Sequence, residues 1–249
     1  MKKSLALFAA LAAITGCQTG TGPEEAGRRF YPAATPTLPP PPAPAALTPA
    51  VYGTLTPSAR QGVVADELRV IGKAIKAYQG KHNGQWPARL TVLVTDGLLP
   101  ARALISAADP TAGKEGGVPD SYDQWQQSSE ADEPACSFLY ELCGATATWG
   151  WASYLGGKPT VADLDTDKNG EVSWQEAKLW QLVRGDTTQS APTGYAKNRF
   201  PVVRCNWYGY PDSKDKPDDR TVISLAADLE TVFLSKPWWE KDNEPVMLP

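Results

Sequence analysis

The sequence predicts an α+β fold, in which one long helix near residues 58–82 packs on a small antiparallel sheet from the last third of the chain. Apolar residues recur at intervals of three and four along the helical segment, as one buried helix face requires. Three runs rich in β-branched and aromatic residues, at 200–208, 221–226 and 230–234, are separated by loops and indicate a meander. After the N-terminal segments are set aside, about 190 residues remain, enough for one domain with a real core.

The long helix is expected to begin at Pro57-Ser58 and to end at His82-Asn83-Gly84. Its apolar face consists of Val64, Leu68, Ile71, Ile75 and Tyr78. His82 is the only histidine of the chain, and its place beside the Asn-Gly turn predicts a solvated surface residue.

The N-terminus has the features of an export signal. Two lysines precede residues 4–15, which are apolar or small and too few to span a membrane. Ile14-Thr15-Gly16-Cys17 resembles the bacterial lipobox, which implies a lipoprotein signal peptide at 1–16, cleavage after Gly16 and a lipid on Cys17. Gln18 after that cysteine favours sorting to the outer membrane. Several acyl chains give durable anchoring, so the membrane is an expected partner; the alternative is an ordinary signal peptide with an incidental cysteine.

Residues 17–57 are expected to form a proline-rich, disordered tether behind the lipid. Ten of the 23 prolines lie between Pro23 and Pro57, and no charged residue occurs from Phe30 to Ala59. Such a segment favours extended polyproline II structure. The single folded domain is then expected at 58–249.

Composition excludes some partners and leaves the cysteines open. Without Lys2 and Lys3 the chain has 22 basic and 28 acidic residues, a net charge of −6, which argues against nucleic acid. Cys136, Cys143 and Cys205 remain as an odd set in an oxidising compartment. Either the segment 136–143 bends enough to bridge its two thiols, or one of them joins Cys205.

The run after the long helix resembles the type II secretion pseudopilins (G-like). Its matching residues are Tyr78, Asn83, Gly84, Trp86, Pro87, Leu90 and Leu93. The resemblance implies a pilin-like fold with a short leucine-bearing second helix, and Asp109-Pro110 as the point where the chain enters its sheet. The hydrophobic prepilin helix of that family is replaced here by Cys17 and the proline tether, which puts filament assembly in doubt.

The segment 165–176 has the pattern of a complete EF-hand calcium loop. Oxygen-bearing or backbone ligands are expected at Asp165, Asp167, Asn169, Glu171, Ser173 and Glu176. Gly170 permits the sharp turn, and Ser173 with Glu176 has the spacing of a capping box for an exiting helix. That helix is expected to bury Ala177, Leu179, Trp180 and Val183 and to stop at Arg184-Gly185-Asp186. Only an interrupted turn at 151–155 is available as the entering helix, and no second loop of this pattern occurs, so calcium is expected to act as a structural clip.

Three weaker patterns leave alternatives open. The run 137–142 is compatible with a strand or a buried helix turn. The nine tryptophans suggest a glycan-stacking face or, more often, core packing. Four aspartates in the loop 211–220 suggest either a second cation site or a solvated loop; they are Asp212, Asp215, Asp218 and Asp219.

The sequence contains no recognisable catalytic motif, so we expect no enzyme. The expected function is a calcium-binding, lipid-anchored envelope protein that acts as a structural or interaction module. A secretion-system accessory is the second possibility, and it would co-purify with secretion components. A glycan-binding or glycan-hydrolysing envelope protein is the third, and it would need exposed tryptophans, with paired carboxylates for hydrolysis.

Overall fold

The computed structural model describes residues 47–114, 135–147, 150–187, 193–209, 221–237, 239–240 and 246–248. All of them belong to one compact unit, Ala45–Pro249, which is separate from the unit Met1–Pro44. The signal peptide, Cys17, most of the expected tether and the four aspartates of 211–220 lie outside the described residues. Within the described part, no helix combines the length and apolar character needed to cross a membrane.

The folded part begins earlier than expected. The tether was placed at 17–57, but α1 (Pro49–Gly53) forms within that range, capped by the side chain of Thr48. Tyr52 of α1 is only 4% exposed and joins the main core. A single large aromatic side chain therefore brings this proline-flanked segment into the fold, which the absence of charge did not predict.

The long helix is confirmed as α2 (Pro57–Lys81), with Thr56 as N-cap and His82 as C-cap. Of its expected apolar face, Val64, Leu68, Ile71 and Ile75 are buried, and Tyr78 is half-buried. Asn83 and Gly84 then turn the chain with positive φ angles. The short leucine-bearing helix follows as α3 (Thr91–Thr95), which buries Leu93, and the turn η1 (Ala101–Leu104) comes after it.

His82 lies at the surface as expected, with 39% of its side chain exposed. Its ring stacks on Tyr78, with 3.9 Å between the ring centroids, and its Nε2 lies 3.1 Å from Oδ2 of Asp96. The imidazole therefore joins the end of α2 to the end of α3.

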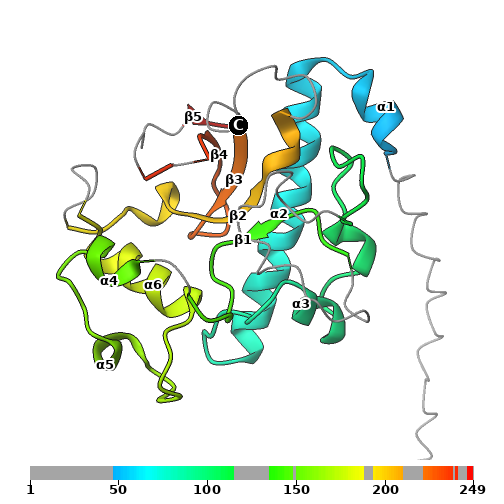
Figure 1. Cartoon of the computed structure of the whole chain (residues 1–249). Helices are drawn as coiled ribbons and strands as arrows, with labels where there is room; N and C mark the ends of the chain where they lie inside the picture. Colours follow the sequence, from blue (N-terminus) through cyan, green and yellow to red (C-terminus); the bar gives the residue numbers. More distant parts are fainter. Residues whose placement is uncertain are drawn as a thin grey trace, which may run out of the picture. The chain divides into compact units, whose positions relative to one another are not determined.

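The antiparallel meander is confirmed and extended by one short strand on each side. Five strands lie in the order of the chain, each antiparallel to the next (Figure 1). They are β1 (Leu139–Tyr140), β2 (Pro201–Cys205), β3 (Val222–Ala226), β4 (Val232–Ser235) and β5 (Val246–Met247). The ambiguous run 137–142 thus contains a strand. The turns η3 (Lys197–Arg199) and η4 (Asn206–Gly209) flank β2.

Both faces of the central strands are buried, because β2 and β3 are covered at every residue. Alternate residues of a strand point to opposite faces. Cys205 reaches Ser106 beside α2, and Leu225 packs against Gly72 of α2, so these residues mark the face that α2 covers. Arg204 therefore points to the opposite face, where its Nη1 lies 2.9 Å from Oε1 of Glu141.

Asp109 does not lead directly into the sheet, which corrects the expectation from the pseudopilin resemblance. Its buried carboxylate accepts hydrogen bonds from the backbone N–H groups of Thr111 and Gly113, both at 2.7 Å. It also accepts one from Oγ of Ser137 at 2.6 Å. The carboxylate stabilises a turn and ties that turn to the segment before β1, because a buried carboxylate needs several donors.

Within the residues that the structure describes, Cys136, Cys143 and Cys205 form no disulfide. The segment 136–143 does bend, since β1 is followed by a turn, but the thiols of Cys136 and Cys143 make separate contacts with Phe138 and Ala145. Burial raises the pKa of Cys136 and of Cys205 to about 12. Both thiols are therefore protonated and poorly reactive at neutral pH.

Candidate metal centre

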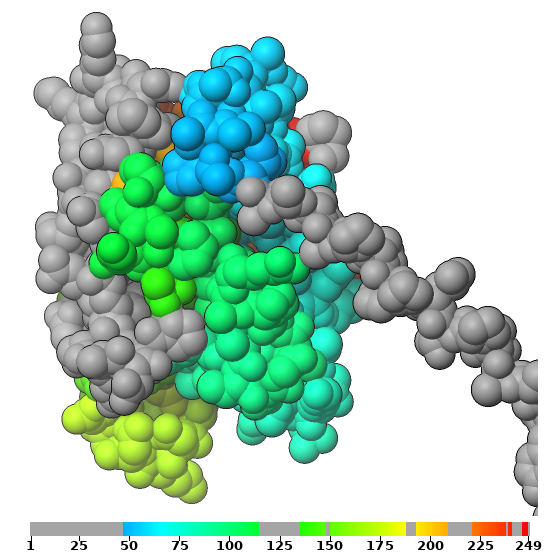
Figure 2. Space-filling view, turned by 90° about the vertical axis from the view of Figure 1, so that its right-hand side faces the viewer, coloured from blue at the N-terminus to red at the C-terminus, as the bar shows by residue number. Residues whose placement is uncertain are grey.

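The expected loop lies between two capped helices at one end of the folded unit. It follows α5 (Val161–Leu164) and precedes α6 (Trp174–Arg184). Figures 1 and 2 both place this region, coloured yellow-green, at the end away from α1. Leu155, Leu164, Val172 and Ala177 form a small core of their own beneath it.

The helix that enters the loop is not the one expected. The turn at 151–155 does form, as α4 (Trp151–Tyr154), but the direct neighbour of the loop is α5. Thr160 and Asp163 form a capping box for α5, with Asp163 accepting from the backbone N–H and the hydroxyl of Thr160. This Thr-x-x-Asp spacing was the sequence signal for α5, although Pro159 directly before it suggested an interruption.

Three carboxylates converge inside the loop. One oxygen each from Asp165, Asp167 and Glu176 lies within 4.8 Å of the other two. Asp165 accepts hydrogen bonds from the backbone N–H groups of Asn169 at 3.0 Å and Gly170 at 2.9 Å. These bonds curl the loop round the carboxylates, which is the arrangement that a small hard cation requires.

Positive φ angles allow that curl. Gly170 has a φ of 88° and Lys168 a φ of 60°. A glycine takes such an angle without steric cost, whereas a side chain resists it. The expected role of Gly170 is therefore confirmed.

Glu176 joins the loop to α6. Its Oε2 accepts from the N–H and the hydroxyl of Ser173, and its Oε1 accepts from the N–H and the hydroxyl of Thr166. Ser173 Oγ in turn accepts from the N–H of Glu176, so the expected capping box is confirmed. Partial burial raises the pKa of Glu176, but these hydrogen bonds outweigh it and hold the pKa below its ordinary value. The carboxylate is thus ionised at neutral pH, as a calcium ligand must be.

The other expected ligands make contacts of different kinds. Asn169 Oδ1 accepts from the N–H of Glu171 at 2.8 Å, so its amide lies within the loop. The carboxylate of Glu171 accepts from Thr146 Oγ1 at 2.6 Å and is directed out of the loop. This agrees with a seventh position that offers its backbone carbonyl, while Ser173 serves as the helix cap.

The loop pairs with a segment that sequence reasoning did not connect to it. Residues 143–147 run antiparallel to 172–175, with a bridge between Thr146 and Ser173. Ala147 N–H donates to Val172 O at 2.7 Å, and Trp174 N–H donates to Ala145 O at 2.9 Å. The single loop thus obtains a β-type partner from its own chain, and no local sequence pattern announces such a pairing.

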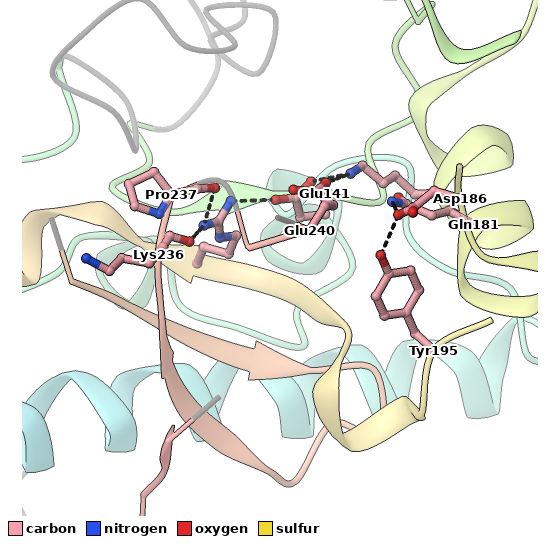
Figure 3. Close-up of polar contacts among 9 residues, drawn as sticks. Glu141, Gln181, Asp186, Tyr195, Lys236, Pro237 and Glu240 are labelled. Atoms are coloured by element: carbon pink, nitrogen blue, oxygen red, sulfur yellow. Dashed lines mark hydrogen bonds and ion pairs between the residues drawn. The ribbon is translucent and has the colours of Figure 1, made fainter. Parts of the chain in front are cut away.

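The buried side of α6 matches the expected one in part, since Ala177 is buried and Leu179 and Trp180 are half-buried. Trp174, Ala177, Lys178, Gln181 and Leu182 are buried, whereas Val183 is 67% exposed. Lys178 lies inside an ion cluster with Glu141, Arg204 and Glu240, and Figure 3 labels the two glutamates. A buried lysine is rare, and the predicted face did not include Lys178.

A second buried polar group lies at the end of α6. Asp186 accepts from Gln181 Nε2 at 3.0 Å and from the hydroxyl of Tyr195 (Figure 3). Tyr195 also packs edge-on against Trp239, with 5.0 Å between the ring centroids. These contacts fix the stop of α6, where Gly185 has a φ of 75°.

The described tryptophans serve packing rather than an open aromatic face. Trp174, Trp207 and Trp239 are buried, and Trp86, Trp151 and Trp180 are half-buried. Lys178 lies over the rings of both Trp174 and Trp239, at 5.8 and 5.4 Å.

The donor set fits calcium. Comparison with protein-family models, with curated proteins and with solved structures gives no significant match. The chemistry of the loop must therefore be judged from its own atoms. Three carboxylates, an amide oxygen and backbone carbonyls are hard oxygen donors, which calcium prefers. No thiol or imidazole belongs to the cluster, so a zinc site does not fit.

Proposed function

We propose that this protein is a calcium-binding, lipid-anchored module of the bacterial envelope, in which calcium acts as a structural clip. The convergence of Asp165, Asp167 and Glu176 in a loop held between two capped helices carries the proposal. Three charged ligands in one isolated loop suit the weak affinity of extracellular sites, roughly 10⁻⁴–10⁻³ M. Such a site is about half to nine tenths loaded at 1 mM calcium, which suits a structural role better than that of a sensor.

The remaining parts of the proposal rest on the sequence. Export and a lipid on Cys17 would place the folded unit at the membrane surface, with the proline-rich segment as spacer. The packing of α2 on β2 and β3 supports a pilin-like arrangement. We propose a non-catalytic interaction role for this unit, in the envelope or beside a secretion system.

Terbium luminescence tests the site directly, because terbium occupies oxygen-rich calcium sites. We expect one terbium per chain, displaced by calcium, and loss of binding in Asp165→Ala with Glu176→Ala. The matched control is Asp66→Ala with Glu230→Ala, which removes one aspartate and one glutamate that are 78% and 73% exposed elsewhere. Equal luminescence from both double variants would reject the site.

A further inference from the structure

The ion cluster behind α6 consists of Glu141, Lys178, Arg204 and Glu240, all at most 7% exposed. Lys178 Nζ lies 2.9 Å from Oε1 of Glu240 and 3.5 Å from Oε2 of Glu141. Arg204 Nη1 donates to Oε1 of Glu141 at 2.9 Å. Two positive and two negative groups are thus paired within the described interior, with Glu141 between the two cations (Figure 3).

The cluster is anchored firmly on the sheet. Arg204 belongs to β2, and its Nη2 donates to the carbonyls of Lys236 and Pro237 at 2.8 and 2.9 Å. Glu141 follows β1 directly, and its N–H donates to Val202 O at 2.9 Å. The two groups that face Lys178 from the sheet are therefore held by backbone pairing as well as by charge.

The same two segments reach the calcium loop. Lys178 lies two residues after the ligand Glu176 on α6, a rigid helix. Glu141 lies at the start of the segment that pairs with the loop, through Gln175 N–H to Cys143 O at 2.8 Å and Ala147 N–H to Val172 O at 2.7 Å. The calcium loop is thus connected to the ion cluster in two ways, through α6 and through residues 141–147.

We propose that the buried ion cluster is a positioning device for the calcium loop, so that calcium affinity depends on the contact between Lys178 and the sheet. This inference rests on the proposed calcium site. Breaking the cluster frees α6 to shift, and with it Glu176 moves relative to the backbone of 145–147. If the loop adopts its closed, binding conformation for only a fraction of the time, its apparent calcium affinity is the intrinsic affinity multiplied by that closed fraction.

Replacement of the lysine tests this without leaving an unpaired buried charge. In Lys178→Met with Glu240→Gln, Arg204 and Glu141 remain a neutral pair, which avoids the large penalty of a lone buried ion. The matched control is Lys76→Met with Glu230→Gln, because Lys76 of α2 and Glu230 of the turn between β3 and β4 form an exposed pair at 2.9 Å. Calcium affinity is measured by calorimetry well below the melting temperature.

We expect a loss of affinity of about tenfold or more in the cluster variant, the effect of a closed fraction near one tenth. The control is expected to bind like the wild type. Unchanged affinity in a folded cluster variant would overturn the inference. Absence of calcium binding by the wild type would instead overturn the proposed function.

A wild-type experiment covers the case in which the cluster variant does not fold. Calcium is titrated while amide and side-chain nitrogen signals are followed by NMR. We expect the signals of Glu141 N–H and Arg204 Nε–H to shift in step with that of Gly170. Shifts confined to the loop residues would show that calcium binds without engaging the cluster, and would reject the inference.

Discussion

Gly170 is the residue on which the loop geometry depends most. A Cβ at this position would meet no atom within 4 Å, so only its φ of 88° resists a side chain. Lys178 differs from Gly170, because its backbone is helical but its charged side chain is buried. The sequence pattern revealed the glycine but not the lysine, since a turn motif is local and a buried ion pair depends on distant partners.

Replacing Gly170 with alanine should weaken the site through backbone strain alone. The left-handed angle costs a side chain on the order of 1 kcal/mol, which corresponds to about fivefold weaker calcium binding. Calorimetry checks the affinity. Gly62→Ala is the control, because this helical position is equally open and has no positive φ. The explanation fails if Gly170→Ala binds as tightly as Gly62→Ala.

Elements were predictable where the local pattern decides them. The limits of α2, the Ser173 cap of α6 and the three-stranded meander all follow from periodicity, capping and turn residues. Elements that depend on distant contacts were missed or misjudged. The helix α1 is held by one buried tyrosine, and β1 and β5 are two-residue strands defined by their neighbours.

The contact between α2 and the sheet depends on Gly72. A Cβ there would lie 2.8 Å from Leu229 O and 3.0 Å from Cδ2 of Leu225. Gly72→Ala should therefore force the helix outward and cost about 1–3 kcal/mol of unfolding free energy, as overpacking does. Gly80→Ala, on the same helix with open space, should be neutral or stabilising. Urea unfolding compares the two, and a Gly72→Ala variant as stable as Gly80→Ala would contradict the close packing.

At the scale of the whole molecule, the loop is connected to the sheet by two contacts. Its exiting helix carries Lys178 to the sheet, and its own backbone pairs with the segment that follows β1. The sequence predicted the convergence of Asp165, Asp167 and Glu176, because EF-hand spacing is short and regular. It did not predict how the loop is connected, because Glu141, Arg204 and Glu240 are far apart along the chain.

Calcium is proposed to stabilise the entire folded unit, and thermal unfolding tests that claim most directly. With free calcium at about 100 times the dissociation constant, linkage contributes about 2.7 kcal/mol, which raises the melting temperature by about 5–10 °C over the chelated protein. Asp165→Ala with Glu176→Ala should abolish that rise, while Asp66→Ala with Glu230→Ala should retain it. Identical melting temperatures of the wild type in calcium and in chelator would contradict the account.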